Sequence, residues 1–190
     1  VTLALALPLA LAVAALQHRP HLARGLEAVV YLSVATSPLV IGTGLFLLIF
    51  PLADPVALAL PVTALVNGVM SLPFALRALV PAAVETEARF GPLADSLGMT
   101  GAHRLRQLTM PRLRRPLGFA AALAAALSMG DLGVIALFAD PTEATLPLYL
   151  YRQMAAYRSG PAEGVALLLL ALSLAAFWLL DRGGRVDADA

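Results

Sequence analysis

Asp131 is the residue of this chain with the clearest potential for chemistry in an apolar setting. It is the only acidic residue in the run from Pro116 to Ala139. In a helix starting at Pro116 it would lie about 22 Å along the axis, beyond the midplane of a bilayer. Carboxylates at such depth are costly and usually face a cavity or a partner. Asp131 is therefore interpreted either as lining a pathway or as a helix-end Asp bonded to backbone amides, for which Gly130 and Gly133 leave room.

Enzymatic chemistry finds little support in the residue inventory. Ser128 and Asp131 share the same run, but no His lies within an apolar segment to complete a protease relay. The sequence has no Cys and no Lys, which excludes a P-loop, cysteine nucleophiles and thiolate metal sites. The histidines lie in short polar stretches without ligand spacing: His18, His21 and His103. The sequence therefore predicts a protein that is not an enzyme, with no ATP-binding site, cofactor or metal of its own.

Apolar runs long enough to cross a membrane organise the chain. Hydrophobic residues make up 60% of the sequence and charged residues only 13%, unlike a soluble domain. A transmembrane helix needs about 20 mostly apolar residues. The candidate runs are Val1–Leu16, Ala28–Ala53, Pro55–Leu76, Pro116–Ala139 and Gly164–Leu180. We expect an all-α, polytopic membrane helix bundle with about five transmembrane helices.

The first run has a second interpretation. Val1–Leu16 is short and contains a small-x-small site at Ala12–Ala14, as a secretory signal peptide does, but it lacks a basic amino-terminal region. We favour a fragment that has lost the amino-terminal part of a larger protein.

The arginines predict the orientation of the bundle, because loops that carry basic residues tend to stay in the cytoplasm. All the basic residues are Arg. Five helices would place every one of them except Arg152 and Arg158 on one side, in three segments: Gln17–Glu27, the loop between Leu76 and Pro116, and the tail after Leu180. We therefore expect this loop and the carboxy terminus to be cytoplasmic.

Helix-breaking and polar residues interrupt the runs in a way that a passive anchor would not need. They are Pro38, Gly42, Gly44, Pro61, Asn67, Gly68 and Pro73. Each proline alone is compatible with an ordinary kink, but together they indicate a bundle bordering a cavity. Asn67 and Asp131 are the candidate residues of a translocation pathway.

The loop before Pro116 predicts two short helices outside the membrane. Val84–Leu97 mixes charged and apolar residues as an amphipathic helix does, and Gly98 can provide a left-handed break. A second helix, Ala102–Met110, is expected to end before Pro111. Arginines that can pair with lipid phosphates follow: Arg112, Arg114 and Arg115.

This helix-elbow-helix resembles the coupling loop of ATP-binding-cassette importer permeases. That loop has Glu-Ala-Ala, three residues, Gly, about nine residues, then a hydrophobic position, one residue, Leu and Pro. When Gly98 is aligned, Ala94 and Pro111 match, while Pro92 replaces Glu and Met110 replaces Leu. The resemblance implies a coupling loop at about 84–115 that docks a cytoplasmic ATPase subunit through these residues: Ala94, Gly98, Gly101, Leu105, Leu108 and Pro111. It predicts the elbow and its length rather than an orienting salt bridge.

Three longer stretches resemble the carboxy-terminal half of the thiamine importer permeases of Gram-negative bacteria: "NGVMSLPFALRALVPAAVETEARFGPLADSLGM", "SMGDLGVIALF" and "TLPLYLYRQMAAYRSG". The resemblance implies a type-1 transmembrane domain over 1–182, incomplete at its amino end, and a cytoplasmic tail over 183–190. It also implies a location in a bacterial inner membrane, with a periplasmic substrate-binding protein, a separate ATPase and a second permease half as partners. Asp131 would then favour the permanent positive charge of thiamine.

Other functions remain open at this stage. Importers of iron(III), sulfate or polyamines share the coupling loop, and a noncatalytic membrane scaffold is the main alternative class. Tyrosines and arginines between Ala139 and Pro161 favour an interfacial helix over a direct thiamine contact, although the delivery protein could dock there. Nucleic-acid binding is not expected, because membrane lipid competes for the arginines.

Overall fold

The computed structural model describes residues 1–16, 19–138 and 144–186. Every regular element in these ranges is helical, which confirms the predicted all-α class. The elements are α1 (Thr2–Ala15), α2 (Pro20–Tyr31), the short 3₁₀ helix η2 (Leu32–Ala35), α3 (Pro38–Ile49), α4 (Ala59–Ser96), α5 (Gly101–Arg104), the π-helical turn η3 (Leu105–Thr109), α6 (Met110–Met129), α7 (Ile135–Phe138), α8 (Leu146–Ala155) and α9 (Ser159–Val186).

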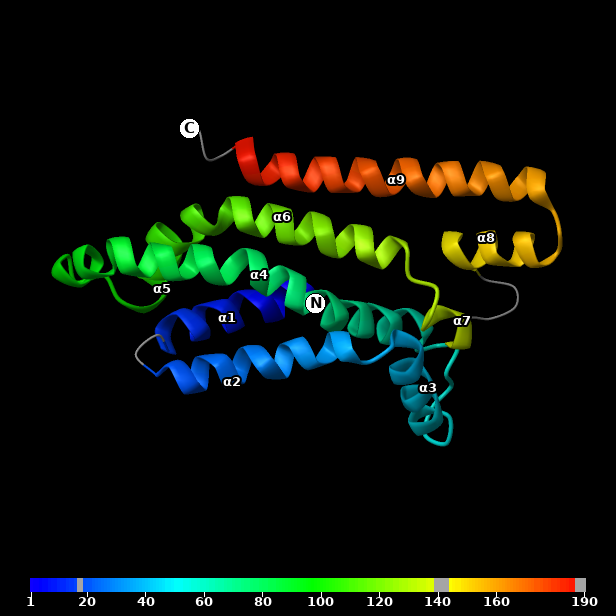
Figure 1. Ribbon diagram of the computed structural model, residues 1–190, viewed down its shortest axis with the longest axis horizontal. Coiled ribbons are helices and arrows are strands. Elements are labelled where there is room, and N and C mark those ends of the chain that lie inside the picture. The colour runs from blue at the N-terminus through cyan, green and yellow to red at the C-terminus, as the bar shows by residue number, and fades with distance from the viewer. Residues whose placement is uncertain (17–18, 139–143, 187–190) are drawn as a thin grey trace.

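Helices α1, α4, α6 and α9 form a series along the long axis of the molecule, with α2 beside α1 (Figure 1). α1 packs on α4, α4 on α6, and α6 on α9. The connection from α4 to α5 lies at one end, on the same side as the end of α1 and the start of α2, and we call this the hairpin end. α3, α7 and α8 lie at the opposite end, which we call the far end.

Small side chains form the core between α1, α4 and α6. Alanines let helix backbones approach closely, which is how helices associate in a membrane, where lipid is as apolar as leucine. Leu76 and Leu79 of α4 and Leu113 of α6 are fully buried in this core. The buried residues are Ala6, Ala10, Ala14, Val30, Leu72, Ala75, Leu76, Leu79, Ala83, Leu113 and Ala120.

A second core closes the far end. Val62 and Val66 of α4 pack with Val134 and Phe138, which come from the segment after α6. The Phe138 ring meets Phe46 of α3 edge to face, with centroids 5.3 Å apart. This cluster anchors α7 and α3 to the start of α4.

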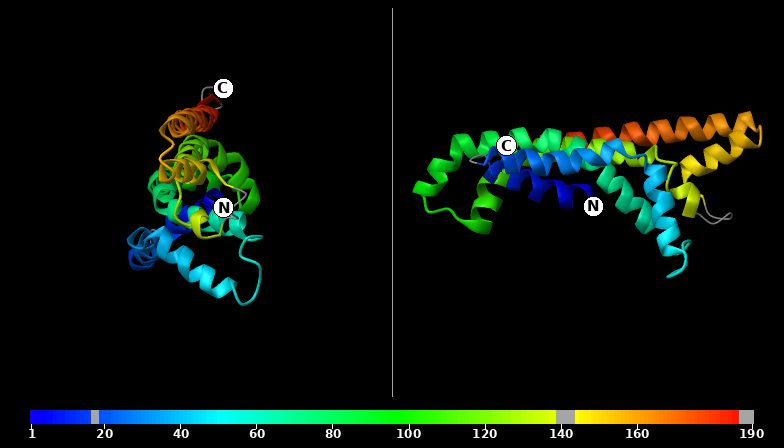
Figure 2. Two further views of the ribbon diagram at one scale, coloured as in Figure 1. Left: turned by 90° about the vertical axis from the view of Figure 1, so that its right-hand side faces the viewer. Right: turned by 60° about the horizontal axis from the view of Figure 1, so that its bottom comes forward.

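The predicted span Ala28–Ala53 is wrong as a single helix. The segments His21–Ala35 and Pro38–Ile49 meet at an angle of 88°, and α3 projects from the other helices in both views of Figure 2. Pro38 causes the break, because a proline disfavours helical geometry in the residue before it. Ser37 accordingly has an extended backbone, with φ −71° and ψ 135°.

The predicted helix Val84–Leu97 is not a separate element. It forms the last part of α4, a continuous helix of 38 residues that contains Pro73, Pro81 and Pro92. Prolines are tolerated in such helices where neighbouring helices compensate for the lost backbone bond. Pro73 is fully buried among such neighbours. The predicted span and the first arm of the predicted loop therefore belong to one continuous helix.

The predicted end of the second short helix before Pro111 is also wrong. After α5 the chain makes the π-helical turn η3 and continues directly into α6, with Pro111 in its first turn. The wide π turn shifts the ladder of backbone hydrogen bonds. The first turn of a helix is also where a missing N–H costs least.

The run Pro116–Ala139 is not one helix either, and Ala139 itself lies outside the described residues. α6 ends at Met129, and Gly130 caps it. Asp131 Oδ1 then accepts a hydrogen bond of 3.1 Å from the Gly133 N–H. Such a local side-chain bond competes with continuation of the helix.

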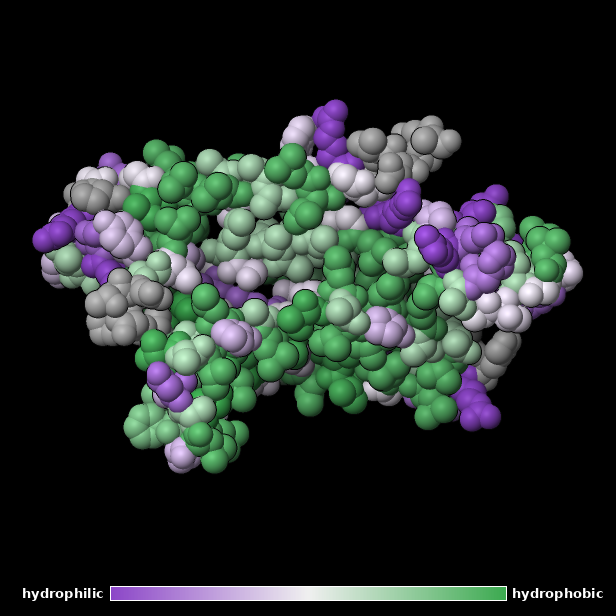
Figure 3. Space-filling view, turned by 180° about the vertical axis from the view of Figure 1, so that it is seen from behind, coloured by the Kyte–Doolittle hydropathy of each residue, from purple (hydrophilic) through white to green (hydrophobic). Residues whose placement is uncertain are grey.

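The described helices contain fewer complete spans than the five expected. Ala59–Ser96 and Ala162–Gly184 are long and apolar enough to cross a membrane, and the bent pair would be a third. The apolar stretch of α9 is not buried within this chain. Apolar residues form a broad band across one face, with most hydrophilic residues towards the two ends (Figure 3). This surface is that of a membrane helix bundle.

Candidate functional site

Gly98 makes the sharp turn at the hairpin end. Its φ is +66°, in the left-handed region that glycine adopts most readily. The Gly98 N–H bonds to the Asp95 carbonyl at 3.1 Å, and the Met99 N–H bonds to the Ala94 carbonyl at 2.9 Å. This is a Schellman motif, which satisfies the last carbonyls of α4. The predicted elbow at Gly98 is therefore present in the structure.

The end of α4, α5, η3 and the start of α6 form a helical hairpin, and the residues predicted for the coupling loop lie together on it. Ala94 is buried beneath the turn, and Gly101, with φ +54°, starts α5. Leu105 is exposed in the π turn. Leu108 and Pro111 line a cavity on the other side of the same turn.

Arg104 ties the two arms of the hairpin together. Its guanidinium group contacts Glu87 Oε1 at 2.5 Å and Asp95 Oδ1 at 2.6 Å. Gly91 makes room for this bridge, because a Cβ atom there would lie 3.2 Å from Arg104 Nη2. The sequence did not predict the bridge, because Glu87 and Asp95 become partners of Arg104 only once the chain has turned at Gly98.

A cation–π contact between Arg112 of α6 and Phe90 of α4 also joins the two arms. The guanidinium carbon of Arg112 lies 3.4 Å from the centroid of the Phe90 ring, and that of Arg89 lies 5.4 Å from it. Arg89, Arg112 and Arg115 line a cavity of about 470 Å³ here. Such cation–π contacts hold the end of α4 against the start of α6.

Apolar side chains are exposed on the outer surface of the hairpin. Leu93 is 58% exposed and Leu97 is 68% exposed, next to the charged Arg104 cluster. Apolar anchors with charged flanks are typical of a helix that docks in a partner's groove. The hairpin thus has ion pairs and a cation–π contact between its arms and exposed leucines on its surface.

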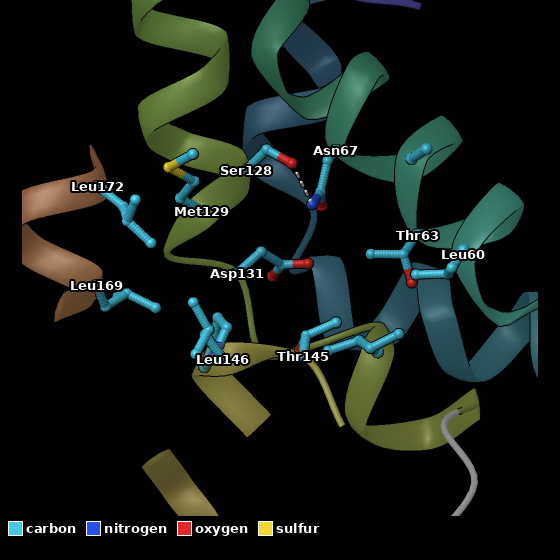
Figure 4. Close-up of a pocket in the computed structure, with 13 residues that line it drawn as sticks. Leu60, Thr63, Asn67, Ser128, Met129, Asp131, Thr145, Leu146, Leu169 and Leu172 are labelled. Carbon is cyan, nitrogen blue, oxygen red and sulfur yellow. Dashed lines mark hydrogen bonds between the residues drawn. The ribbon is translucent and has the colours of Figure 1, made fainter. Parts of the chain in front are cut away.

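A cavity of about 320 Å³ lies at the far end, between α4, the end of α6, α8 and α9. Figure 4 shows Asp131 near its centre, between Asn67 and Thr145. The Asn67 Nδ2 atom donates a hydrogen bond of 3.2 Å to Ser128 Oγ. Both predicted pathway residues, Asn67 and Asp131, therefore line the same cavity, and none of the described residues that line it has a basic side chain.

Asp131 combines features of both interpretations made from the sequence. Its Oδ1 atom caps the backbone at Gly133, as expected of a helix-end Asp. Its Oδ2 atom is buried and has no hydrogen-bond partner among the described residues. One carboxylate oxygen is thus used in the turn, and the other is buried without a partner in a residue that lines the cavity.

Thr63 and Thr145 are site residues that sequence reasoning missed. Both hydroxyl oxygens are buried, line the cavity and lack a hydrogen-bond partner within the described part of the chain. Figure 4 shows them on the side of Asp131 away from Leu169 and Leu172. Threonine in an apolar helix commonly bonds to its own backbone, so no sequence signal distinguished these two.

A second cavity at the far end, of about 220 Å³, shares Asn67 and Asp131 with the far-end cavity of about 320 Å³. It is bordered by Pro38, Ser71 and Phe74. Asn67 is only 8% exposed and stands with Asp131 between the two spaces. These residues form a polar partition within an apolar surrounding.

The predicted interfacial region contains α8 and the turn after it. Tyr149 and Tyr151 of α8 are exposed, and Tyr157, with φ +56°, is 97% exposed. Residues 139–143 at the start of this region lie outside the described residues. Placement of these tyrosines at a membrane interface remains a prediction.

Comparison with known proteins gives consistent relatives. The chain is similar to the thiamine transport system permease protein of Brucella abortus (strain 2308), with 42% identity over 153 residues, or 80% of this chain and 28% of that protein. The corresponding protein of Salmonella typhimurium is 38% identical over 151 residues, covering 80% and 28%. That of Escherichia coli (strain K12) is 37% identical over 160 residues, covering 83% and 30%. The chain thus spans less than a third of the length of these curated relatives.

No solved structure matches the chain. The family model described as binding-protein-dependent transport system inner membrane component matches residues 6–183. That range includes α4, α6 and most of α9, together with the hairpin end and the residues that line the far-end cavity. With its apolar helices and this near-complete match, the chain belongs to the family of binding-protein-dependent transport system inner membrane components.

Proposed function

We propose that this chain forms part of the permease of an ATP-driven importer for thiamine and its phosphates. The observation that carries the proposal is the similarity of 37–42% identity to thiamine transport system permease proteins over about four fifths of the chain. Shared residues over so much of a membrane domain favour a shared solute over membership of the wider family alone.

The hairpin is the proposed dock for a separate ATPase subunit. Its exposed leucines, Leu93 and Leu97, offer apolar contact, while Arg104 and the Arg112–Phe90 stack make the two arms one rigid unit. A rigid unit can pass a displacement of the ATPase on to α4 and α6, which continue directly into the bundle. The hairpin end would then face the cytoplasm, together with the carboxy terminus.

The far end is the proposed entry side. A periplasmic substrate-binding protein would deliver the solute there, and a second permease half would complete the pathway. The domain assignment of 1–182, with a tail over 183–190, belongs to this proposal. Asn67 and Asp131 are its candidate pathway residues, because both line the cavity at this end.

Growth on limiting thiamine tests the function in cells. The host would be a bacterium that cannot synthesise thiamine and lacks its own thiamine permease. We expect the full-length protein, expressed with its partner subunits, to restore growth and uptake of labelled thiamine. Failure with thiamine, combined with restored uptake of iron(III), sulfate or a polyamine, would favour a related importer. No uptake of any of these solutes would favour a scaffold.

A further inference from the structure

Three buried oxygen atoms in the described residues lack a hydrogen-bond partner: Thr63 Oγ1, Asp131 Oδ2 and Thr145 Oγ1. All three belong to residues that line the far-end cavity. Buried polar groups are nearly always hydrogen-bonded, and each exception needs an explanation. Their convergence on one cavity indicates a binding site, because chance would scatter them over separate places.

Thr63 differs from other hydroxyl residues of the helices. Thr43, Ser71 and Thr86 each donate to the backbone carbonyl four residues earlier, at 2.8, 2.7 and 2.7 Å. This bond is the ordinary way for a hydroxyl to be satisfied in an apolar helix. The Thr63 hydroxyl makes no such bond and is buried without a partner among the described residues, in a residue that lines the cavity (Figure 4).

Asp54 forms the same local turn as Asp131 and therefore shows which of the features of Asp131 the turn explains. Asp54 Oδ1 accepts a hydrogen bond of 3.0 Å from the Val56 N–H, and Asp131 Oδ1 accepts one of 3.1 Å from the Gly133 N–H. Both residues therefore form the same local turn with one oxygen. Asp54 is exposed to the surroundings, whereas Asp131 Oδ2 is buried. The turn alone does not account for a carboxylate facing the cavity.

The chemistry of the lining defines the ligand class. Among the described residues that line the cavity there is no Arg or His, so the Asp131 charge has no basic partner among them. A buried carboxylate is costly unless it is paired. Leucines and Met129 supply an apolar surround, and a volume of about 320 Å³ suits a small organic molecule. The complementary ligand is a small, partly apolar organic cation with hydrogen-bonding groups.

We propose that the far-end cavity binds the solute as an organic cation, with Asp131 as its counter-ion and the Thr63 and Thr145 hydroxyls as hydrogen-bond partners. This inference rests on the proposed function and specifies a site within it. The Asn67–Ser128 hydrogen bond holds α4 and α6 together beside the bound solute. Asn67 and Asp131 also line the smaller cavity next to it.

Equilibrium binding to the purified full-length transporter, without ATP, tests the site. The probes are labelled thiamine, which is permanently cationic, and thiochrome, a neutral derivative of similar size. Asp131→Asn keeps an oxygen for the Gly133 turn and removes the charge. We expect it to weaken thiamine binding about tenfold or more and to change thiochrome binding little. Asp54→Asn is the matched control and should leave both affinities unchanged.

The two hydroxyls are tested separately from the charge. Thr63→Val and Thr145→Val keep the shape of the side chains and are each expected to weaken thiamine binding by about threefold to tenfold. Thr43→Val is the control, because the Thr43 hydroxyl already bonds to the Leu39 carbonyl. It should leave thiamine binding unchanged. The threonine variants keep the proposal testable if Asp131→Asn fails to assemble.

A charge-selective loss in Asp131→Asn, with losses in the threonine variants, supports the site. Equal weakening of thiamine and thiochrome in Asp131→Asn, or unchanged thiamine binding in both threonine variants, would overturn it. A wild-type transporter that neither binds nor transports thiamine would overturn the proposed function instead. The same variants would then be measured with spermidine, and unchanged binding of that cation in Asp131→Asn would overturn the site as well.

Discussion

Gly118 of α6 and Gly184 of α9 approach so closely that a Cβ atom at Gly118 would lie 2.7 Å from the Gly184 Cα atom. Neither glycine has a positive φ, so the requirement is for space between the helices. A Cβ atom at Gly184 would also lie 2.9 Å from the Arg114 carbonyl oxygen. This contact brings the two backbones together at a place where no side chain can fit.

Gly118→Ala is therefore expected to destabilise the bundle by about 1–3 kcal/mol, because the obstructing atoms are backbone and cannot rotate away. Thermal unfolding of the detergent-purified transporter measures the effect. Gly164→Ala in α9 is the control, since nothing lies within 4 Å of a Cβ atom there. Equal stability of the two variants would contradict the close helix contact.

Gly98→Val should abolish transport while the protein still inserts in the membrane. A β-branched residue at φ +66° is strained, and loss of the Schellman motif would move the hairpin away from its ATPase. The measurements are thiamine uptake and copurification of the ATPase. Gly98→Asn is the matched control, because Asn tolerates left-handed geometry. Normal uptake by the Val variant would mean that the turn has no part in coupling.

Arg104→Gln should loosen the hairpin without unfolding the bundle. The carboxylates of Glu87 and Asp95 are substantially exposed, so the effect on overall stability is expected to be under about 1 kcal/mol. Hydrogen exchange of residues 96–104 should become faster, and more so than in the control Arg106→Gln. Identical exchange in the two variants would show that the bridge does not hold the arms together.

Labelling of single cysteines tests the orientation, since this chain has no Cys. In a cysteine-free full-length protein, Tyr157→Cys at the far end should react with a membrane-impermeant maleimide in intact cells. Leu97→Cys at the hairpin should react only after permeabilisation. The opposite pattern would overturn the placement of the arginine-rich end in the cytoplasm.

The sequence predicted the features that depend on local chemistry. Apolar runs predicted an all-α membrane bundle, and Gly98 predicted the turn because few other residues adopt its geometry. Asp131 was recognised because a lone carboxylate in an apolar run is unusual. In each case one residue or run carries the signal without knowledge of its neighbours.

The features that were missed depend on partners distant in sequence. Pro38 was recognised as an interruption, but the 88° bend also reflects the contact of Phe46 with Phe138. Pro111 was expected to end a helix. The π turn before it instead leads directly into α6, so that Pro111 lies in the first turn of that helix. Thr63 and Thr145 became notable only when the fold brought their oxygens to the same cavity.

ATP-dependent uptake of labelled thiamine into proteoliposomes tests the central claim most directly. The vesicles would contain the full-length permease with its ATPase, and the substrate-binding protein would be added on the far-end side. The account predicts accumulation that requires ATP, is lost in Gly98→Val and persists in Gly98→Asn. The contradicting result is a complex that is active but does not transport thiamine. If the loaded binding protein stimulates ATP hydrolysis but no thiamine accumulates in the vesicles, the chain does not belong to a thiamine importer.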